Sequence, residues 1–288
     1  MTASAPQATA AAPLAALLPT RQGKPWTVGP APYGIRNNAA TSRITDGRRA
    51  LIVVEDAGRV ELFADRPDRP DRPDRFPVTP DAVVDSTDPV SVAALAARAL
   101  RWILPRLDAD AAQDMARKAV PNEQPWQWVM RHKGAALTEV GFALVQHGTH
   151  PVARERLGGP GLTWTADSGA ECEWGVWAYG AAGNFHLTYD GPVSGLYGAL
   201  PVLLPPLDER VCTKARSAFA QYLTDRFPQL HPANDGEVEF GGRQDLSGWV
   251  ALPSRTELRG PVHDGTPVCA QVGSVGVDFL LAIAPHLI

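Results

Sequence analysis

Cysteine is scarce in this sequence, with only Cys172, Cys212 and Cys269 among 288 residues. Their odd number, wide separation and lack of any Cys-x-x-Cys spacing argue against a disulfide framework and against a thiolate zinc site. Free thiols are typical of a reducing compartment, so we predict a cytoplasmic protein.

Long apolar runs are also missing. The most apolar late segment, Val275 to Ala284, is too short to span a bilayer and contains Asp278. The opening MTASAPQATAAAPLAALLPT has no basic residue ahead of its apolar part, and Pro13 interrupts that part, which is not the pattern of a cleaved signal peptide. We therefore expect no membrane contact and interpret residues 1–25 as a disordered tail.

The sequence has no excess of positive charge and few of the common catalytic motifs. Its formal net charge of -4 disfavours nucleic acid as a partner, because binding to phosphates needs clustered Lys and Arg. It contains no GxxxxGK[ST] phosphate loop, no G-x-S-x-G elbow, no HExxH and no strand followed by GxGxxG. We predict no cofactor, and we favour a non-enzymatic interpretation.

The clearest pattern lies in Glu173 to Pro192, EWGVWAYGAAGNFHLTYDGP. Two extended runs flank Ala181-Ala182-Gly183, which suits a tight turn with a left-handed glycine and predicts a β-hairpin. A three-residue loop would place Trp177 opposite Leu187 on an apolar core face. The opposite face would then carry a half-polar set that we predict to bind a partner: Trp174, His186, Thr188 and Asp190.

An earlier segment, Ala50 to Pro67, matches Gly175 to Pro192 without a gap at a distance of 125 positions. The shared residues fall on the turn, the core face and the strand exit, and each hairpin precedes an amphipathic helix. In the same register, four side chains of the first hairpin would face inward: Ile52, Val54, Val60 and Leu62. This predicts an internal duplication, although the chance similarity of two common α+β units is an alternative.

Between the first hairpin and its helix lies the repeat DRPDRPDRPDR, residues 65–75. Proline at every third position excludes helix and sheet interior and favours an extended, solvated loop. This loop is either a recognition strap for a partner or a tolerated low-complexity insertion. Asp88-Pro89 then predicts a helix start, with Asp88 as N-cap and Pro89 at the first helical position.

Two further sets of side chains are candidates for function. Trp126 and Trp128 lie in a predicted loop, VPNEQPWQW, where they would stack on a ligand or plug the core. His147 and His150 are spaced for a shared metal on a helix. Gly148 and Pro151 predict that the helix ends between them, and no Asp or Glu follows at a familiar zinc spacing.

We therefore predict an α+β fold of two related units, 26–125 and 126–288, each an antiparallel hairpin or sheet with helices packed on one face. The favoured function is a non-catalytic cytoplasmic protein that binds another protein through an exposed sheet face, as an inhibitor or immunity-like factor would. The alternative is a metal-assisted hydrolase that uses His147 and His150.

Overall fold

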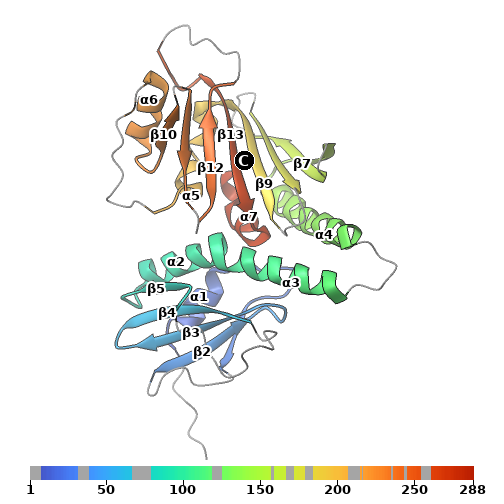
Figure 1. Ribbon diagram of the computed structural model, residues 1–288, viewed down its shortest axis with the longest axis vertical. Coiled ribbons are helices and arrows are strands. Elements are labelled where there is room, and N and C mark those ends of the chain that lie inside the picture. The colour runs from blue at the N-terminus through green and yellow to red at the C-terminus, as the bar shows by residue number, and fades with distance from the viewer. Residues whose placement is uncertain are drawn as a thin grey trace, which may run out of the picture. The chain divides into compact units, whose positions relative to one another are not determined.

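The computed structural model describes residues 8–31, 39–66, 79–118, 125–156, 159–166, 172–178, 184–206, 215, 217–234, 236–242, 245–253 and 261–288, with side chains described outside 113–131. The chain forms two compact units, Met1–Ala111 and Ala112–Ile288 (Figure 1). The division therefore lies earlier than the predicted boundary after residue 125. Each unit contains one antiparallel sheet with helices, so the α+β class is confirmed.

The sheet of the first unit is a five-stranded meander in chain order. Its strands are β1 (Thr27–Pro30), β2 (Ala40–Thr45), β3 (Ala50–Asp56), β4 (Arg59–Asp65) and β5 (Ala82–Val84). Asp56 pairs with Arg59, so Ala57 and Gly58 form a two-residue turn, and both have positive φ, 50° and 83°. This is the geometry of a type I′ hairpin turn, which suits the right-handed twist of the strands.

The two-residue turn changes the predicted facing of the first hairpin. Leu62 pairs with Val53, whereas Ile52 pairs with Phe63. Ile52 and Val54 therefore lie on one face of the sheet, and Val60 and Leu62 lie on the other. All four side chains are buried, because both faces of the central strand β3 are covered.

Helix α1 (Ala11–Leu17) lies within the stretch that we expected to be a disordered tail. Ala11 and Leu14 are fully buried, and the Ala8 backbone N–H donates to Ser42 Oγ of β2 at 2.9 Å. The Glu55 carboxylate of β3 accepts a hydrogen bond from the Thr9 backbone N–H at 2.8 Å. The alanines and leucines of this segment are thus core residues, which corrects the expectation for residues 8–25.

The predicted helix start at Asp88 is confirmed. The Asp88 carboxylate accepts from the backbone N–H groups of Val90 and Ser91, and Pro89 occupies the first turn. Helix α2 (Pro89–Arg98) continues through a π-helical segment (Ala99–Ile103) into α3 (Leu104–Lys118). The chain from Pro89 to Lys118 is therefore one continuous helical stretch. Residues 67–75 of the proline repeat lie outside the described residues.

The second unit contains an eight-stranded antiparallel sheet of order β10-β11-β12-β13-β9-β8-β7-β6. Figure 1 shows α6 beside β10 at one edge and α4 beside β7 towards the other edge. The strands are β6 (Val152–Arg156), β7 (Gly159–Thr165), β8 (Glu173–Ala178), β9 (Phe185–Pro192), β10 (His231–Asn234), β11 (Glu237–Phe240), β12 (Ser247–Ala251) and β13 (Pro267–Val275). The segment after Pro151, Val152–Arg156, is a strand that pairs with β7.

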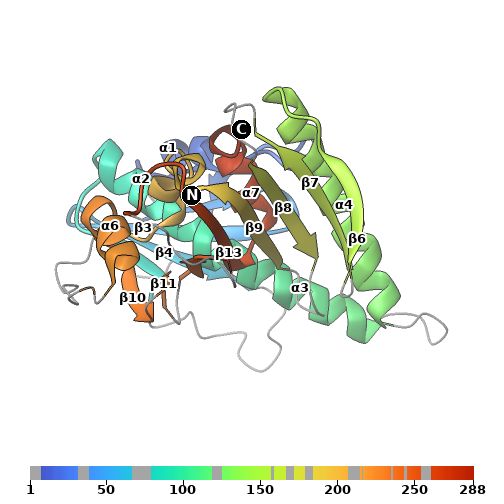
Figure 2. The same cartoon turned by 90° about the horizontal axis from the view of Figure 1, so that it is seen from above.

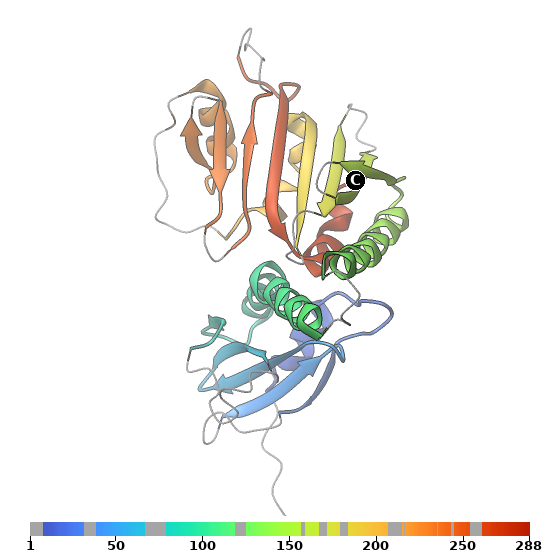
Figure 3. The ribbon, with the colours of Figure 1, turned by 45° about the vertical axis from the view of Figure 1, so that its right-hand side comes forward.

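The helices of this unit are α4 (Pro125–Gln146), α5 (Leu200–Leu203), α6 (Ala218–Arg226) and α7 (Val277–Ile283), with short 3-10 turns at Val193–Leu196 and Ala284–His286. Leu196, Leu200 and Leu203 pack on the sheet against Trp174, Leu187 and Tyr189. In Figure 3 the gold and orange helices, α5 and α6, lie behind the strands. One face of the sheet is therefore the hydrophobic core of the unit.

The structure does not confirm an internal duplication. Both matched segments form antiparallel hairpins, but their registers differ. Leu62 pairs with Val53, and a shift of 125 positions would pair Leu187 with Ala178, whereas Leu187 pairs with Val176. Among the described residues, no helix has both the length and the apolar character needed to cross a membrane.

Candidate functional site

The register of β8 against β9 decides which side chains of the second hairpin are available to a partner. Trp177 pairs with His186, and Trp174 pairs with Tyr189. The predicted register placed Trp177 opposite Leu187, so the true pairing is displaced by one residue. Because side chains alternate along a strand, this displacement exchanges the two faces of β8 while leaving β9 unchanged.

Trp174 therefore belongs to the core face, which corrects its assignment to the binding face. It is 2% exposed and lies among the buried side chains of that face, with its ring centroid 4.7 Å from that of Tyr189. The predicted turn at Ala181-Ala182-Gly183 lies outside the described residues, and the last described pair is Ala178 with Phe185. Trp174 is not available as a surface anchor.

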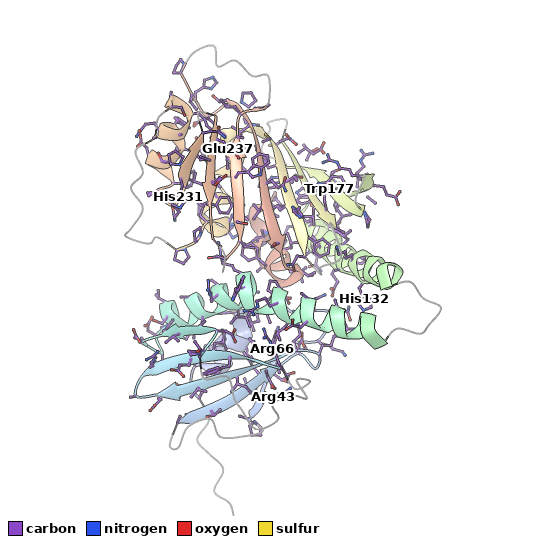
Figure 4. All side chains as sticks on the ribbon, in the orientation of Figure 1. Arg43, Arg66, His132, Trp177, His231 and Glu237 are labelled. Carbon is purple, nitrogen blue, oxygen red and sulfur yellow. The ribbon has the colours of Figure 1, made fainter. Side chains whose placement is uncertain are left out.

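The opposite side of the sheet, which we call the polar face, is formed by alternate residues of four adjacent strands. Its members are Glu173 and Trp177 of β8, His186, Thr188 and Asp190 of β9, Cys269 and Gln271 of β13, and Trp249 of β12. The predicted residues His186, Thr188 and Asp190 thus share one face. Figure 4 shows Trp177 towards the β7 side of this sheet and His231 and Glu237 towards its other edge.

Trp177 lies flat on the polar face and is held there by specific contacts. The indole Nε1 of Trp177 donates to Thr188 Oγ1 at 3.0 Å. The guanidinium of Arg156, on strand β6, lies 4.0 Å from the centroid of the Trp177 ring. Gly175 leaves space for the ring, since a Cβ at that position would lie 2.6 Å from Trp177 Nε1. With only 3% of its surface exposed, the indole acts as a platform beneath Arg156.

His186 and Gln271 connect β9 to β13 at the centre of the polar face. Gln271 Nε2 donates to His186 Nδ1 at 2.9 Å, since an amide nitrogen can only donate. Burial, and then the positive charge of Lys133 in α4, lower the pKa of His186 below its ordinary value of 6.5. The imidazole is therefore neutral at pH 7, and the hydrogen bond from Gln271 assigns its proton to Nε2.

A pair of carboxylates lies at one end of the polar face. Asp190 pairs directly with Glu173, and both line a cavity of about 490 Å³ with Thr165. Burial and then the charge of Glu173 raise the pKa of Asp190, while Arg156 opposes that rise. Burial also raises the pKa of the Cys269 thiol, with Asp190 adding to the effect. Cys269 is therefore a protonated thiol rather than an activated nucleophile.

The helix was predicted to end between the two histidines, and it ends just before both of them. Helix α4 ends at Gln146, and Gly148 adopts a left-handed backbone conformation with φ of 93°. His147 and His150 are both exposed and lie on different sides of this turn. Within the described ranges, no group of three or more His, Cys, Asp or Glu side chains is arranged to hold a metal ion.

Trp126 and Trp128 are not in a loop, in contrast to their prediction. Both belong to the first turns of helix α4, which begins at Pro125. Their side chains lie outside those that the structure describes. Pro125 occupies the first helical position, where proline is a helix-start signal, and this signal outweighs the loop-like composition of VPNEQPWQW.

The predicted binding set lacked several members of the polar face, among them Trp177, Gln271 and Trp249, and it also lacked Arg156 beside that face. The predicted register placed Trp177 on the core face, and Arg156 lies on strand β6. Gln271 lies on β13, where it pairs with Thr188. A search for polar residues at alternate positions of every predicted strand would have found Gln271.

Comparison with known proteins assigns no family to the chain, since no protein-family model, no curated protein and no solved structure matches it.

Proposed function

We propose that the chain is a non-catalytic regulatory protein that binds another protein through the polar face of its eight-stranded sheet. One observation carries this proposal: the polar face displays half-buried Trp249, His186 and Gln271 with the acidic pair Glu173 and Asp190, whereas Leu196, Leu200 and Leu203 pack on the other side of the sheet. Aromatic residues surrounded by polar groups are typical of protein interfaces.

The chemistry of the face supports binding rather than catalysis. The neutral imidazole of His186 is engaged with Gln271, and the Cys269 thiol is protonated, so neither is arranged as an activated nucleophile with its base. The carboxylates of Glu173 and Asp190 are suited to accept hydrogen bonds from basic groups of a partner. A role as an inhibitor or immunity-like factor in the cytoplasm agrees with such a surface.

The alternative function, a metal-assisted hydrolase, has less support. It would need His147 and His150 to share an ion, but both follow the end of α4 at Gln146, and the left-handed Gly148 lies between them, so they do not share a helical turn. A purified sample that holds stoichiometric zinc, manganese or iron, and loses it in both His147→Ala and His150→Ala variants, would favour this alternative over the binding protein.

Site-specific photo-crosslinking in cells tests the binding proposal. A photoreactive amino acid in place of Trp249 is expected to give one discrete adduct, because Trp249 lies within the polar face. The matched control replaces Val90 of α2, which is 80% exposed and belongs to the first unit. Absence of an adduct at position 249, or the same adduct at both positions, would contradict the proposal.

The partner identified in this way then allows a quantitative measurement. Trp249→Ala is expected to weaken the complex by about 2 kcal/mol, the usual threshold for an interface hot spot. Val90→Ala should leave the dissociation constant unchanged. Isothermal titration calorimetry with purified proteins would measure both.

A further inference from the structure

The edge strand β6 differs from the other sheet edges in the described part of the molecule. Strand β1 contains Pro30, β5 has three residues, and β10 contains Pro232 and an irregular register. Strand β6 has five residues, pairs regularly with β7 along its length, contains no proline and is exposed throughout. An exposed regular edge is a template for an added strand unless it is protected.

An apolar groove lies directly beside this edge. It has a volume of about 520 Å³ and is formed by α4, β6 and β7, with Leu137, Phe142 and Val145 contributed by the helix and Ala153 and Leu162 by the strands. Figure 2 shows α4 running alongside β6 and β7 in the view from above. Phe142 is 68% exposed and Val145 is 53% exposed, so both have substantial apolar surface in water.

The two sides of β6 have different chemistry. Ala153 pairs with Leu162 and lies on the groove side, together with Glu155. Alternation along the strand places the side chains of Arg154 and Arg156 on the other side, where the Arg156 guanidinium covers Trp177, although Arg154 also borders the groove. A strand added to β6 would place its side chains alternately beside these arginines and against the groove.

From this geometry we propose that β6 and the α4 groove bind an extended segment of another protein in which acidic and apolar residues alternate. The acidic side chains pair with Arg154 and Arg156, and the apolar side chains cover Phe142 and Val145. The backbone of the segment extends the sheet by one strand. This site borders the polar face at Arg156, which covers Trp177. The residues changed in its test, Arg154 and Phe142, lie outside the polar face, so failure of either proposal leaves the test of the other intact.

A second copy of this chain fits the edge less well. Antiparallel pairing of two β6 strands over their full length places Arg154 directly opposite the same residue of the other copy. Like charges in directly opposed positions destabilise a sheet. The charge pattern therefore favours a foreign acidic segment over self-association.

The test uses the full chain and two short synthetic peptides, one alternating glutamate with valine and one alternating lysine with valine. The glutamate peptide is expected to bind about tenfold more tightly or better, because it is complementary to Arg154 and Arg156. Equal affinity for both peptides, or no binding of the glutamate peptide, would overturn the proposal. Fluorescence anisotropy with labelled peptides measures both affinities.

Three variants locate the binding site. Arg154→Glu and Phe142→Asp are each expected to weaken the glutamate peptide about tenfold or more, whereas Val90→Asp, on an exposed position of α2, is not. All three positions are exposed, so circular dichroism should show an unchanged fold. If Arg154→Glu and Phe142→Asp left the affinity for the glutamate peptide unchanged, the peptide would not bind at β6 and the α4 groove.

Hydrogen exchange distinguishes strand addition from simple charge attraction. Backbone amides in Val152–Arg156 are expected to exchange more slowly in the peptide complex, because an added strand pairs with this edge. Unchanged exchange there would overturn strand addition. A dimer of the free chain that dissociates in Arg154→Glu would instead make a second copy the occupant and would also overturn the proposal.

Discussion

Trp174 lies directly opposite Tyr189 in the pairing of β8 with β9, with the two rings tilted by 55°. The Tyr189 hydroxyl donates to the Pro192 carbonyl oxygen at 2.6 Å, and 1% of Tyr189 is exposed. The two rings are therefore fixed parts of the core of the second unit. Their substitution should affect folding rather than recognition.

Trp174→Ala is accordingly expected to lower the free energy of unfolding by about 3 to 5 kcal/mol, because it leaves a cavity in a packed core. Urea denaturation followed by circular dichroism measures the loss. Phe142→Ala is the matched control and should change stability by about 0.5 kcal/mol or less, since Phe142 is largely exposed. Equal stability of the two variants would show that Trp174 is not buried in solution.

Gly175→Ala is expected to destabilise the chain by about 1 to 3 kcal/mol, because the added methyl group overlaps the indole of Trp177 and the Thr188 hydroxyl. Trp177→Leu should relieve much of this cost by removing the ring. A double-mutant cycle from denaturation midpoints measures the coupling. Strict additivity of the two substitutions would contradict the flat position of the indole.

The pKa of His186 is expected to lie below 6.5 in the folded chain, because burial and then Lys133 disfavour the charged ring. The unfolded chain binds this proton more readily, so the stability contributed by His186 is present above about pH 6.5 and is lost as pH falls through the folded pKa. Nuclear magnetic resonance titration of the His186 ring measures the value. Lys133→Met should raise the pKa of His186. A pKa of His186 at or above 6.5 in the wild-type chain would refute the claim that burial and Lys133 disfavour its charged form.

In the first unit, Arg49 and Asp46 form a buried ion pair with a distance of 2.7 Å between Nη2 and Oδ2. Burial raises the pKa of Asp46, but the charge of Arg49 and hydrogen bonds from Arg49 and Arg48 outweigh it, so the net pKa is lowered. The carboxylate therefore contributes stability above about pH 4 that is lost on further acidification.

Arg49→Met should cost about 3 to 5 kcal/mol at pH 7, because it leaves a buried carboxylate without its main partner. The difference from the wild type should shrink below about pH 4, where Asp46 becomes protonated in the variant. Arg154→Met, an exposed arginine of β6, serves as the control. A loss that does not depend on pH would indicate that Arg49 acts only through packing.

The sequence was sufficient for the fold class and for features that depend on neighbouring residues. Asp88 was identified as a helix cap because the signal lies within four residues. His186, Thr188 and Asp190 were grouped correctly because alternation along one strand does not depend on its partner. The helix end before Gly148 followed in the same way from a local glycine signal.

Trp174 and Trp177 were exchanged for a reason that lies outside any single strand. Which face of β8 joins which face of β9 depends on the number of residues in the connecting loop, and a change of one residue reverses the result. The burial of Ala11 and Leu14 likewise results from tertiary packing, because it depends on contact with a sheet formed later in the chain. Neither relationship is encoded in a local pattern.

The unequal edges of the eight-stranded sheet limit the stoichiometry of any complex formed by strand addition. Head-to-tail growth into an open filament needs two compatible edges on each copy. Pro232 removes a backbone donor from β10, and the register of that strand is interrupted, so only the β6 edge offers a regular template among the described strands of this sheet. Assembly at β6 would therefore stop after one added segment, giving a closed complex instead of a polymer.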